Sequence, residues 1–296
     1  MYPQQIDDTD LDRIPADRTV LIAGPTASGK SALALRIAVR HGGIIVNADA
    51  SQVYDCWRVL TARPTRDDET RARHRLYGHI TAQQNYSTGH WLREVTRLLD
   101  GPERLIIVGG TGLYFSALTE GLADIPTVSE EVRGAADALT REAMLRDLDA
   151  ETLARIDKLN PVRVQRAWEV LQTTGQGLAH WQDTTPDPAL RLSDAHAILV
   201  DAPREWLMPR LEERFDIMLR DGALEEVRAV LPIYDPSLPA HRAIGAPELV
   251  AHLHGEVDLE EARARAIVAT RQYAKRQRTW FRARMKTWAV YRPKTD

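Results

Sequence analysis

The stretch Gly24-Pro-Thr-Ala-Ser-Gly-Lys-Ser31 decides the fold, because it matches the phosphate-loop pattern G-x-x-x-x-G-K-S at every specified position. A short β-branched run at 19–23 precedes it, and a helix-forming run at 31–40 follows. Glycines let such a loop wrap tightly, so that backbone N–H groups and a helix N-terminus face an anion. Lys30 adds a positive charge, and the Ser31 hydroxyl is placed to bind Mg²⁺. The residues predicted to bind phosphate or diphosphate are Gly24, Pro25, Thr26, Ala27, Ser28, Gly29, Lys30 and Ser31.

Strand and helix patterns alternate around this loop. Two further short apolar runs, 43–49 and 105–108, have the composition of buried strands, and a helical pattern at 88–99 lies between them. Another strand pattern occurs at 196–200. This alternation predicts an α/β fold, namely a P-loop NTPase-like parallel sheet core with helices on both faces.

The middle of the chain has a different pattern. After residue 122 the strand signal stops, and helix-forming segments separated by Pro161 and by glycines fill 128–181. Two long helical patterns, 204–231 and 259–288, then return the chain to the core. We therefore predict a flexible N-terminal lead at 1–17, a core domain at 18–121 and 196–296, and a helical insertion domain at 122–195.

The overall composition is that of an ordinary folded protein. The 296 residues are 44% hydrophobic, with 39 Lys+Arg against 42 Asp+Glu, which excludes wholesale disorder and collagen-like architecture. No apolar run approaches the length needed to cross a bilayer, and the acidic start does not resemble a signal peptide. Cys56 is the lone cysteine, so no internal disulfide forms. These features predict a cytoplasmic protein with no membrane association.

The charge is distributed unevenly. Residues 263–295 contain eight Arg, three Lys and no Asp or Glu, which leaves 28 basic residues against all 42 acidic ones elsewhere. A basic C-terminal arm on an acidic body is typical of a face that meets a polyanion. The alternative is a solvated helix face with no partner.

Two further segments belong to the same predicted sheet edge as the phosphate loop. Asp49 ends the second strand, where open α/β sheets place their ligands, and it could bind Mg²⁺, accept a substrate proton or cap a helix. The run Gly109-Gly-Thr-Gly112 ends the third strand. It allows either close backbone approach to a ligand, with Thr111 as a hydroxyl donor, or a tight turn into the next helix.

Five segments taken together resemble one known family. The resemblance, which runs from about residue 19 to residue 288, is to the tRNA dimethylallyltransferases. The chain departs from the usual family pattern at Ala50, at Asn160-Pro161 and at Ile244-Gly-Ala-Pro247. The segments that carry the resemblance are Gly24-PTASGKS-Ser31, Asn47-ADASQVY-Tyr54, Thr61-ARP-Pro64, Val108-GGTGLY-Tyr114 and Ala269-TRQYAKRQRTWFR-Arg282.

The resemblance implies a particular reaction. In this family the phosphate loop holds dimethylallyl diphosphate, no phosphoryl group is transferred, and the dimethylallyl group passes to N6 of adenosine 37 in tRNA, giving N6-dimethylallyladenosine. It implies that Asp49 is the general base and that Thr26, Lys30 and Arg214 are diphosphate ligands. It also implies that the insertion domain closes on the tRNA anticodon stem-loop. Mg²⁺ is the expected cofactor, from the phosphate loop, and we expect the enzyme to be a monomer.

Contacts to tRNA are implied by the family-like stretches 49–52, 162–166 and 242–247, and the Gly-rich turn and the basic arm add further candidates. The candidate tRNA-binding residues are Asp49, Ala50, Ser51, Gln52, Thr111, Arg163, Gln165, Arg166, Arg242, Arg278 and Arg282.

Three other functions are compatible with a phosphate loop. A P-loop kinase of a small metabolite would use the insertion as a lid over ATP, but it has no use for an acid-free basic arm. A nucleotide-switched RNA-binding protein would form no chemical product. Prenylation of free AMP would need neither the insertion nor the arm.

Overall fold

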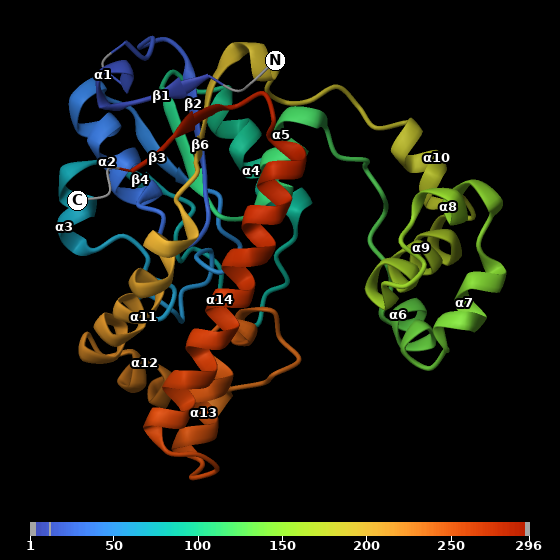
Figure 1. Cartoon of the computed structure of the whole chain (residues 1–296). Coiled ribbons are helices and arrows are strands. Elements are labelled where there is room, and N and C mark those ends of the chain that lie inside the picture. Colours follow the sequence, from blue (N-terminus) through green and yellow to red (C-terminus); the bar gives the residue numbers. More distant parts are fainter. Residues whose placement is uncertain (1–3, 12, 294–296) are drawn as a thin grey trace. The chain divides into compact units, whose positions relative to one another are not determined.

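The computed structural model describes residues 4–11 and 13–293, and its core is a parallel β-sheet (Figure 1). Within the described residues the sheet has seven strands in the order β1-β7-β6-β2-β5-β3-β4, and every neighbouring pair is parallel. The strands are β1 Gln5–Ile6, β2 Thr19–Ala23, β3 Ile44–Asn47, β4 His74–Arg75, β5 Leu105–Gly109, β6 Ala195–Val200 and β7 Ala289–Tyr291. The predicted α/β class with a parallel sheet is confirmed.

Strand β2 occupies the middle of the sheet. Val20 pairs with Ile106 of β5 on one side and with His196 of β6 on the other. Residues 20–23 are fully buried, as expected for a strand with both faces of its sheet covered. The phosphate loop therefore leaves the carboxyl end of the best-shielded strand.

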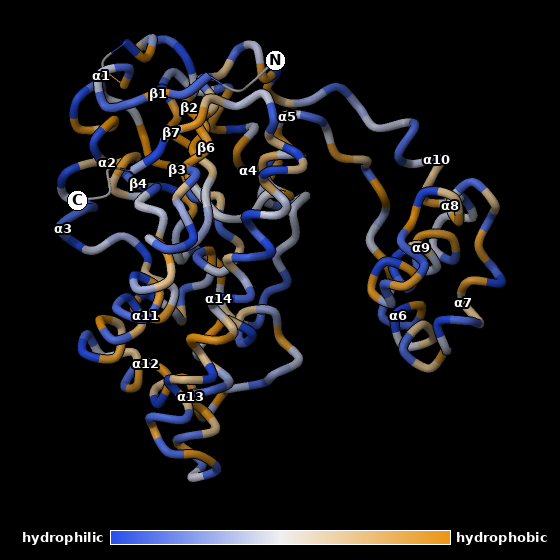
Figure 2. The backbone as a smooth tube through the Cα atoms, viewed as in Figure 1, coloured by the Kyte–Doolittle hydropathy of each residue, from blue (hydrophilic) through white to orange (hydrophobic). Residues whose placement is uncertain are grey.

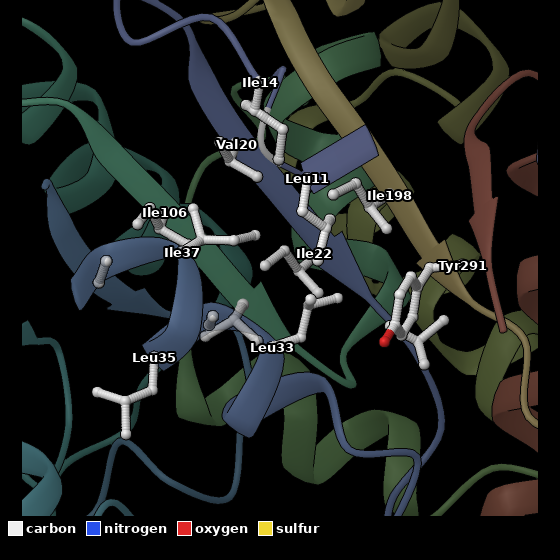
Figure 3. Packing of buried hydrophobic residues seen from close by; sticks show 14 of the residues in the cluster. Leu11, Ile14, Val20, Ile22, Leu33, Leu35, Ile37, Ile106, Ile198 and Tyr291 are labelled. Carbon is white, nitrogen blue, oxygen red and sulfur yellow. The ribbon is translucent and has the colours of Figure 1, made fainter. Parts of the chain in front are cut away.

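Helix α2, Lys30–His41, covers one face of the sheet (Figure 3). Its Leu33 and Ile37 pack against Val20, Ile22 and neighbouring strand residues. Figure 1 shows α4, α5 and α14 on the opposite side. The remaining helices of the sheet-containing unit are α1 Asp8–Leu11, α3 Arg66–Arg71, α4 Thr88–Leu99, α5 Gly112–Glu120, α11 Arg204–Arg220, α12 Ala223–Val230, α13 Ala246–Leu253 and α14 Leu259–Arg284, with short 3₁₀ turns at Leu192–Asp194, Leu231–Ile233 and Ala240–Arg242.

The N-terminal segment differs from the flexible lead predicted at 1–17. Strand β1 pairs in parallel with β7, and the described side chains Ile6, Leu11 and Ile14 are buried against α2 and the sheet (Figure 3). The sequence shows no periodicity here because the strand has two residues and the helix four, too short to display one. The prediction of a free lead is wrong for the part that the structure describes.

Two helix predictions need adjustment. The helix predicted at 204–231 is broken after α11, because Gly222 has φ = 101° and so takes a left-handed conformation that starts α12. The helix predicted at 259–288 ends at Arg284, and the chain then forms β7. Strand β7 has only three residues, too few to show the alternation of apolar and polar residues by which a strand is recognised in a sequence.

A second compact unit spans Ala117–Ala189, close to the insertion predicted at 122–195. Four of its five helices start at a capping side chain: Ser129, Thr140, Asp149 and Asn160 accept backbone N–H groups. A small core around Trp168 holds the helices together. The helices are α6 Glu130–Asp137, α7 Arg141–Asp147, α8 Ala150–Arg155, α9 Pro161–Thr174 and α10 Leu178–Asp183.

Hydrophobic residues are prominent along the central strands (Figure 2). No helix in the described part of the chain combines the length and apolar character that crossing a membrane requires.

Replacing Leu11 with Ala tests whether the N-terminal segment belongs to the core. Leu11 is 6% exposed, so Leu11→Ala should lower the free energy of unfolding by about 2–5 kcal/mol. Thr9→Ala, at an exposed neighbour, should change it by less than about 0.5 kcal/mol. Urea denaturation of both variants measures the difference, and equal stabilities would mean that the segment contributes nothing.

Candidate active site

The phosphate loop has the conformation that an anion cradle requires. Ala27 and Gly29 both take positive φ, 60° and 84°, which reverses the chain around Ser28. The Lys30 side chain folds back over the loop, with Nζ 3.5 Å from the Pro25 carbonyl oxygen, and is only 9% exposed. Successive backbone N–H groups in such a turn make a concave anion site.

A cavity of about 420 Å³ adjoins this loop. The loop contributes Thr26, Lys30 and Ser31, and the segment after β3 contributes residues 49–52. Residues of α11 and α14 complete the wall. The predicted site residues that line the cavity are Thr26, Lys30, Ser31, Asp49, Ala50, Ser51, Gln52, Arg214 and Arg242.

Three charged groups influence one another at the base of this cavity. Burial lowers the pKa of Lys30 to about 8, while the nearby Asp49 carboxylate acts in the opposite direction and Arg214 adds to the lowering. Burial also lowers the pKa of the Arg214 guanidinium, and Asp49 again opposes the shift. Two cations with one carboxylate leave a net positive charge in a sheltered place. Such a site favours a polyanionic ligand.

Arg214 is distinguished from its neighbour Arg210 by the structure. Both lie on α11 four residues apart, and the family resemblance selects Arg214 as the diphosphate ligand. Arg214 is half-buried and lines the cavity, whereas the Arg210 guanidinium lies 4.2 Å from the centre of the Trp206 ring. Only Arg214 is positioned to meet a ligand beside Lys30.

The Asp49 carboxylate is held in place by short-range hydrogen bonds. Its Oδ1 accepts from the Ser51 N–H at 3.1 Å and from the Ser51 hydroxyl at 2.7 Å. The Asn47 side chain accepts from the Asp49 N–H at 2.8 Å and donates to the Asp49 carbonyl at 2.9 Å. Because Asn47 is fully buried, this segment is anchored to β3. No helix starts at Asp49, since the next helix along the chain is α3 at Arg66–Arg71. The capping role considered from the sequence therefore does not apply.

The Gly-rich turn after β5 makes room for protein rather than for a ligand. A Cβ at Gly109 would lie 1.9 Å from the Ala48 carbonyl oxygen, and one at Gly112 would lie 2.3 Å from the Trp280 ring. Thr111 does not line the cavity; its hydroxyl accepts from the Ala50 N–H at 2.9 Å. Thr111 thus supports the Asp49 segment, and the glycines admit the β3 segment and α14.

The remaining candidate tRNA-binding residues are not part of the cavity lining. Arg163 is exposed on α9 of the insertion unit, where Gln165 donates to Asp137 at 2.7 Å and Arg166 lies 3.9 Å from Glu169. On α14, Arg278 is half-buried with an Nε that finds no partner among the described residues, and Arg282 is exposed 3.8 Å from Asp201.

The basic arm is partly neutralised by acidic residues of α11. Arg263 forms two hydrogen bonds with Asp216, and Arg271 pairs with Glu212. The sequence could not reveal these pairs, because the partners are 47 and 59 residues apart. The positive charge of the arm is therefore least neutralised toward its C-terminal part. Arg276 lines the cavity there, and Arg278 and Arg282 follow it in the chain.

Sequence reasoning assigned no site to several residues that line the cavity. Thr270, Tyr273 and Arg276 occur at intervals of three on α14, so they share a face, and this spacing is a signal that could have found them. The aromatic and apolar wall has no such signal, since its members come from separate segments. They include Tyr54, Leu60, Tyr86, Phe215 and Met218.

The parallel sheet, the phosphate loop and the cationic cavity at its carboxyl edge define a P-loop α/β protein that binds a phosphorylated ligand. The chain belongs to the IPP transferase family, whose model matches residues 52–284.

Close relatives match nearly the whole chain. A tRNA dimethylallyltransferase of Ruegeria sp. (strain TM1040) is 64% identical over 284 residues, covering 96% of this chain and 99% of that protein. The tRNA dimethylallyltransferase of Roseobacter denitrificans is 65% identical over 277 residues, covering 94% and 99%. Among solved structures, the tRNA delta(2)-isopentenylpyrophosphate transferase of Staphylococcus epidermidis superposes with a TM-score of 0.62 at 28% identity, covering 93% of this chain and 92% of that one. The family expected from the sequence motifs is confirmed.

The pKa of Lys30 makes anion binding dependent on pH. Lys30 carries its proton below about pH 8 and loses it above, so pyrophosphate should bind progressively more weakly as pH rises through that value. Lys30→Arg keeps its charge throughout, because a guanidinium is not deprotonated in this range.

Calorimetric titration with pyrophosphate from about pH 7 to about pH 9 measures this effect. The ligand gains negative charge over the same range, and both proteins report that gain equally. The ratio of the two affinities therefore isolates Lys30. A ratio that stays constant across the range would contradict the assignment.

Proposed function

We propose that this protein transfers a dimethylallyl group from dimethylallyl diphosphate to N6 of adenosine 37 in tRNA. The observation that carries the proposal is the meeting of Lys30, Arg214 and Asp49 in one cavity. Two sheltered cations suit a diphosphate leaving group, and a carboxylate beside them suits removal of a proton from an attacking amine.

The chemistry requires both charges together. The exocyclic amine of adenine is a poor nucleophile because its lone pair is delocalised into the ring. As the bond between N6 and the allylic carbon forms, the bond from that carbon to the diphosphate oxygen breaks. The proton leaves N6 for the Asp49 carboxylate, and inorganic pyrophosphate departs. Adenosine thereby becomes N6-dimethylallyladenosine, and no phosphoryl group is transferred.

Charge develops mainly on the departing diphosphate, so donors concentrated there lower the barrier. The loop amides, the Thr26 hydroxyl, Lys30 and Arg214 supply these donors from a preorganised cavity.

The loop also suits Mg²⁺, with Ser31 as the protein ligand. Ser31 contributes to the cavity lining, and Ser28 of the same loop is buried with an Oγ that has no hydrogen-bond partner in the described structure. The described residues contain no cluster of three or more His, Cys, Asp or Glu that would form a metal cage. This pattern fits an ion shared between one hydroxyl and substrate phosphates, which is the usual mode for Mg²⁺. When bound, the ion would neutralise diphosphate charge.

The other wall of the cavity suits an isoprenoid chain and an unstacked base. Tyr54, Leu60, Tyr86 and Phe215 supply aromatic and aliphatic surface within reach of the polar floor. Single-stranded RNA loops are recognised by stacking of extruded bases on aromatic side chains. The apolar wall thus supports a substrate that combines a prenyl group with a nucleobase.

Contacts to the RNA backbone belong to the cationic side chains outside the cavity floor. We assign these contacts to Arg242, Arg278 and Arg282 in the core unit and to Arg163 with its neighbours Gln165 and Arg166 in the insertion unit. We further propose that the insertion closes on the anticodon stem-loop and that the enzyme works in the cytoplasm as a monomer.

One incubation tests the function. The protein, Mg²⁺, dimethylallyl diphosphate and unmodified tRNA are combined, the RNA is digested, and nucleosides are analysed by mass. N6-dimethylallyladenosine is the expected product. Parallel reactions replace the donor with ATP or the tRNA with AMP. Formation of ADP would favour a metabolite kinase, and prenylated AMP would remove tRNA as the acceptor.

Asp49→Asn tests the proposed base. The amide keeps the shape of the carboxylate and can still accept from the adenine amine, so the affinities for tRNA and donor should change little. It cannot take up the proton, so the single-turnover rate at saturating substrates should fall on the order of 10²-fold or more. Asp55→Asn, at an exposed position outside the cavity, is the matched control and should retain full activity.

The concentration of Mg²⁺ is varied in the same experiment. Recovery of the rate at high Mg²⁺ would identify Asp49 as a metal ligand instead. A rate close to wild type would remove Asp49 from the mechanism.

Neutralising Arg278 and Arg282 together tests the RNA-binding role of the basic arm. The double variant Arg278→Gln, Arg282→Gln should bind tRNA more weakly and with a shallower dependence on salt. Each lost phosphate contact should reduce the slope of log affinity against log salt by about 0.7–0.9. Filter binding across a salt series gives this slope, and pyrophosphate affinity serves as the control that should not change. An unchanged slope would show that the two residues only pack within the fold.

A further inference from the structure

One buried polar side chain joins the two halves of the cavity floor. Gln277, on α14, is 5% exposed. Its Oε1 accepts from the Thr26 N–H at 2.9 Å, and its Nε2 donates to the Gly110 carbonyl oxygen at 2.9 Å. Thr26 belongs to the phosphate loop and Gly110 to the turn after β5, so a single amide bridges two loops that are distant in sequence.

The Gly110 end of this bridge leads directly to Asp49. The next residue, Thr111, donates its N–H to the Ala48 carbonyl at 3.1 Å and accepts from the Ala50 N–H through its hydroxyl at 2.9 Å. These bonds flank Asp49 on both sides. The turn and the Asp49 segment are therefore one hydrogen-bonded assembly.

The Thr26 end leads to the diphosphate side of the cavity. Thr26, whose N–H is held by Gln277, also lines the cavity. The following residue, Ala27, has φ = 60°, a conformation that residues other than glycine rarely adopt. Such a backbone persists only where surrounding contacts maintain it, and the Gln277 bond is the contact next to it.

The close approach of α14 requires the glycine at 110. A Cβ there would lie 2.3 Å from Gln277 Nε2, so no other residue fits without displacing the amide. The Gly-rich turn is thus shaped to receive this side chain. The same helix face also carries Tyr273 and Arg276 into the cavity.

We propose that Gln277 is a positioning residue that sets the phosphate loop at its working distance from Asp49. It contacts no reacting atom; it acts through Thr26 on the diphosphate side and through Gly110 on the base side. Two measurements test this proposal. The measurement of turnover rests on the proposed prenyl transfer, whereas the measurement of pyrophosphate binding does not.

The binding arm compares Gln277→Met with Gln272→Met. Methionine matches glutamine in length and removes both hydrogen bonds, while Gln272 is exposed on the same helix and outside the cavity. Gln277→Met should weaken pyrophosphate binding by roughly tenfold, the effect of about one lost hydrogen bond, and Gln272→Met should not change it. Gln277→Glu keeps the acceptor for Thr26 but adds a negative charge beside the loop, so it should weaken binding further.

The turnover arm measures kcat, the KM of each substrate and the melting temperature of the same three variants. Gln277→Met should lower kcat and raise the KM of the donor, with the KM of tRNA unchanged. A lower melting temperature with wild-type pyrophosphate affinity and wild-type kcat would overturn the proposal, because Gln277 would then serve stability alone. If wild type forms no prenylated tRNA, the proposed function fails, and the pyrophosphate comparison still decides the role of Gln277.

Discussion

Parallel pairing of β2 with β5, and of β5 with β3, is the constraint on which the site depends. Parallel strands end at the same edge of a sheet, so the three loops that follow them meet there. The first is the phosphate loop, the second is the Gly-rich turn, and the third carries Asp49. An antiparallel arrangement of the same strands would separate these loops by the height of the sheet. The meeting of the phosphate loop, the Gly-rich turn and the Asp49 segment follows from this alignment.

Three charged side chains, Lys30, Arg214 and Asp49, lie in the cavity at this edge of the sheet. Lys30 and Arg214 lose hydration on burial, which lowers the pKa of each, and the Asp49 carboxylate opposes both shifts. The carboxylate is itself held by two hydrogen bonds from Ser51. A preorganised site spends little free energy on reorientation when charge develops on a leaving group.

The fold was largely predictable because its signals are local. The strands β2, β3, β5 and β6 and the helices α2 and α4 each have a composition that indicates their type, and the structure places them within a few residues of expectation. The strands that were missed, β1, β4 and β7, have two or three residues each. Strands of that length are stabilised by pairing with a neighbour rather than by their own sequence.

The site divides in the same way. The phosphate loop and the carboxylate of Asp49 could be recognised from the sequence by itself, because a contiguous motif contains the backbone geometry and the charge that its chemistry needs. The pairing of Arg263 and Arg271 with α11, and the bridge from Gln277 to Thr26, were decided only by the tertiary structure. Gln277 lies 251 residues from Thr26, and no local pattern records a hydrogen bond across that separation. Such contacts exist only after packing brings α14 against the sheet edge.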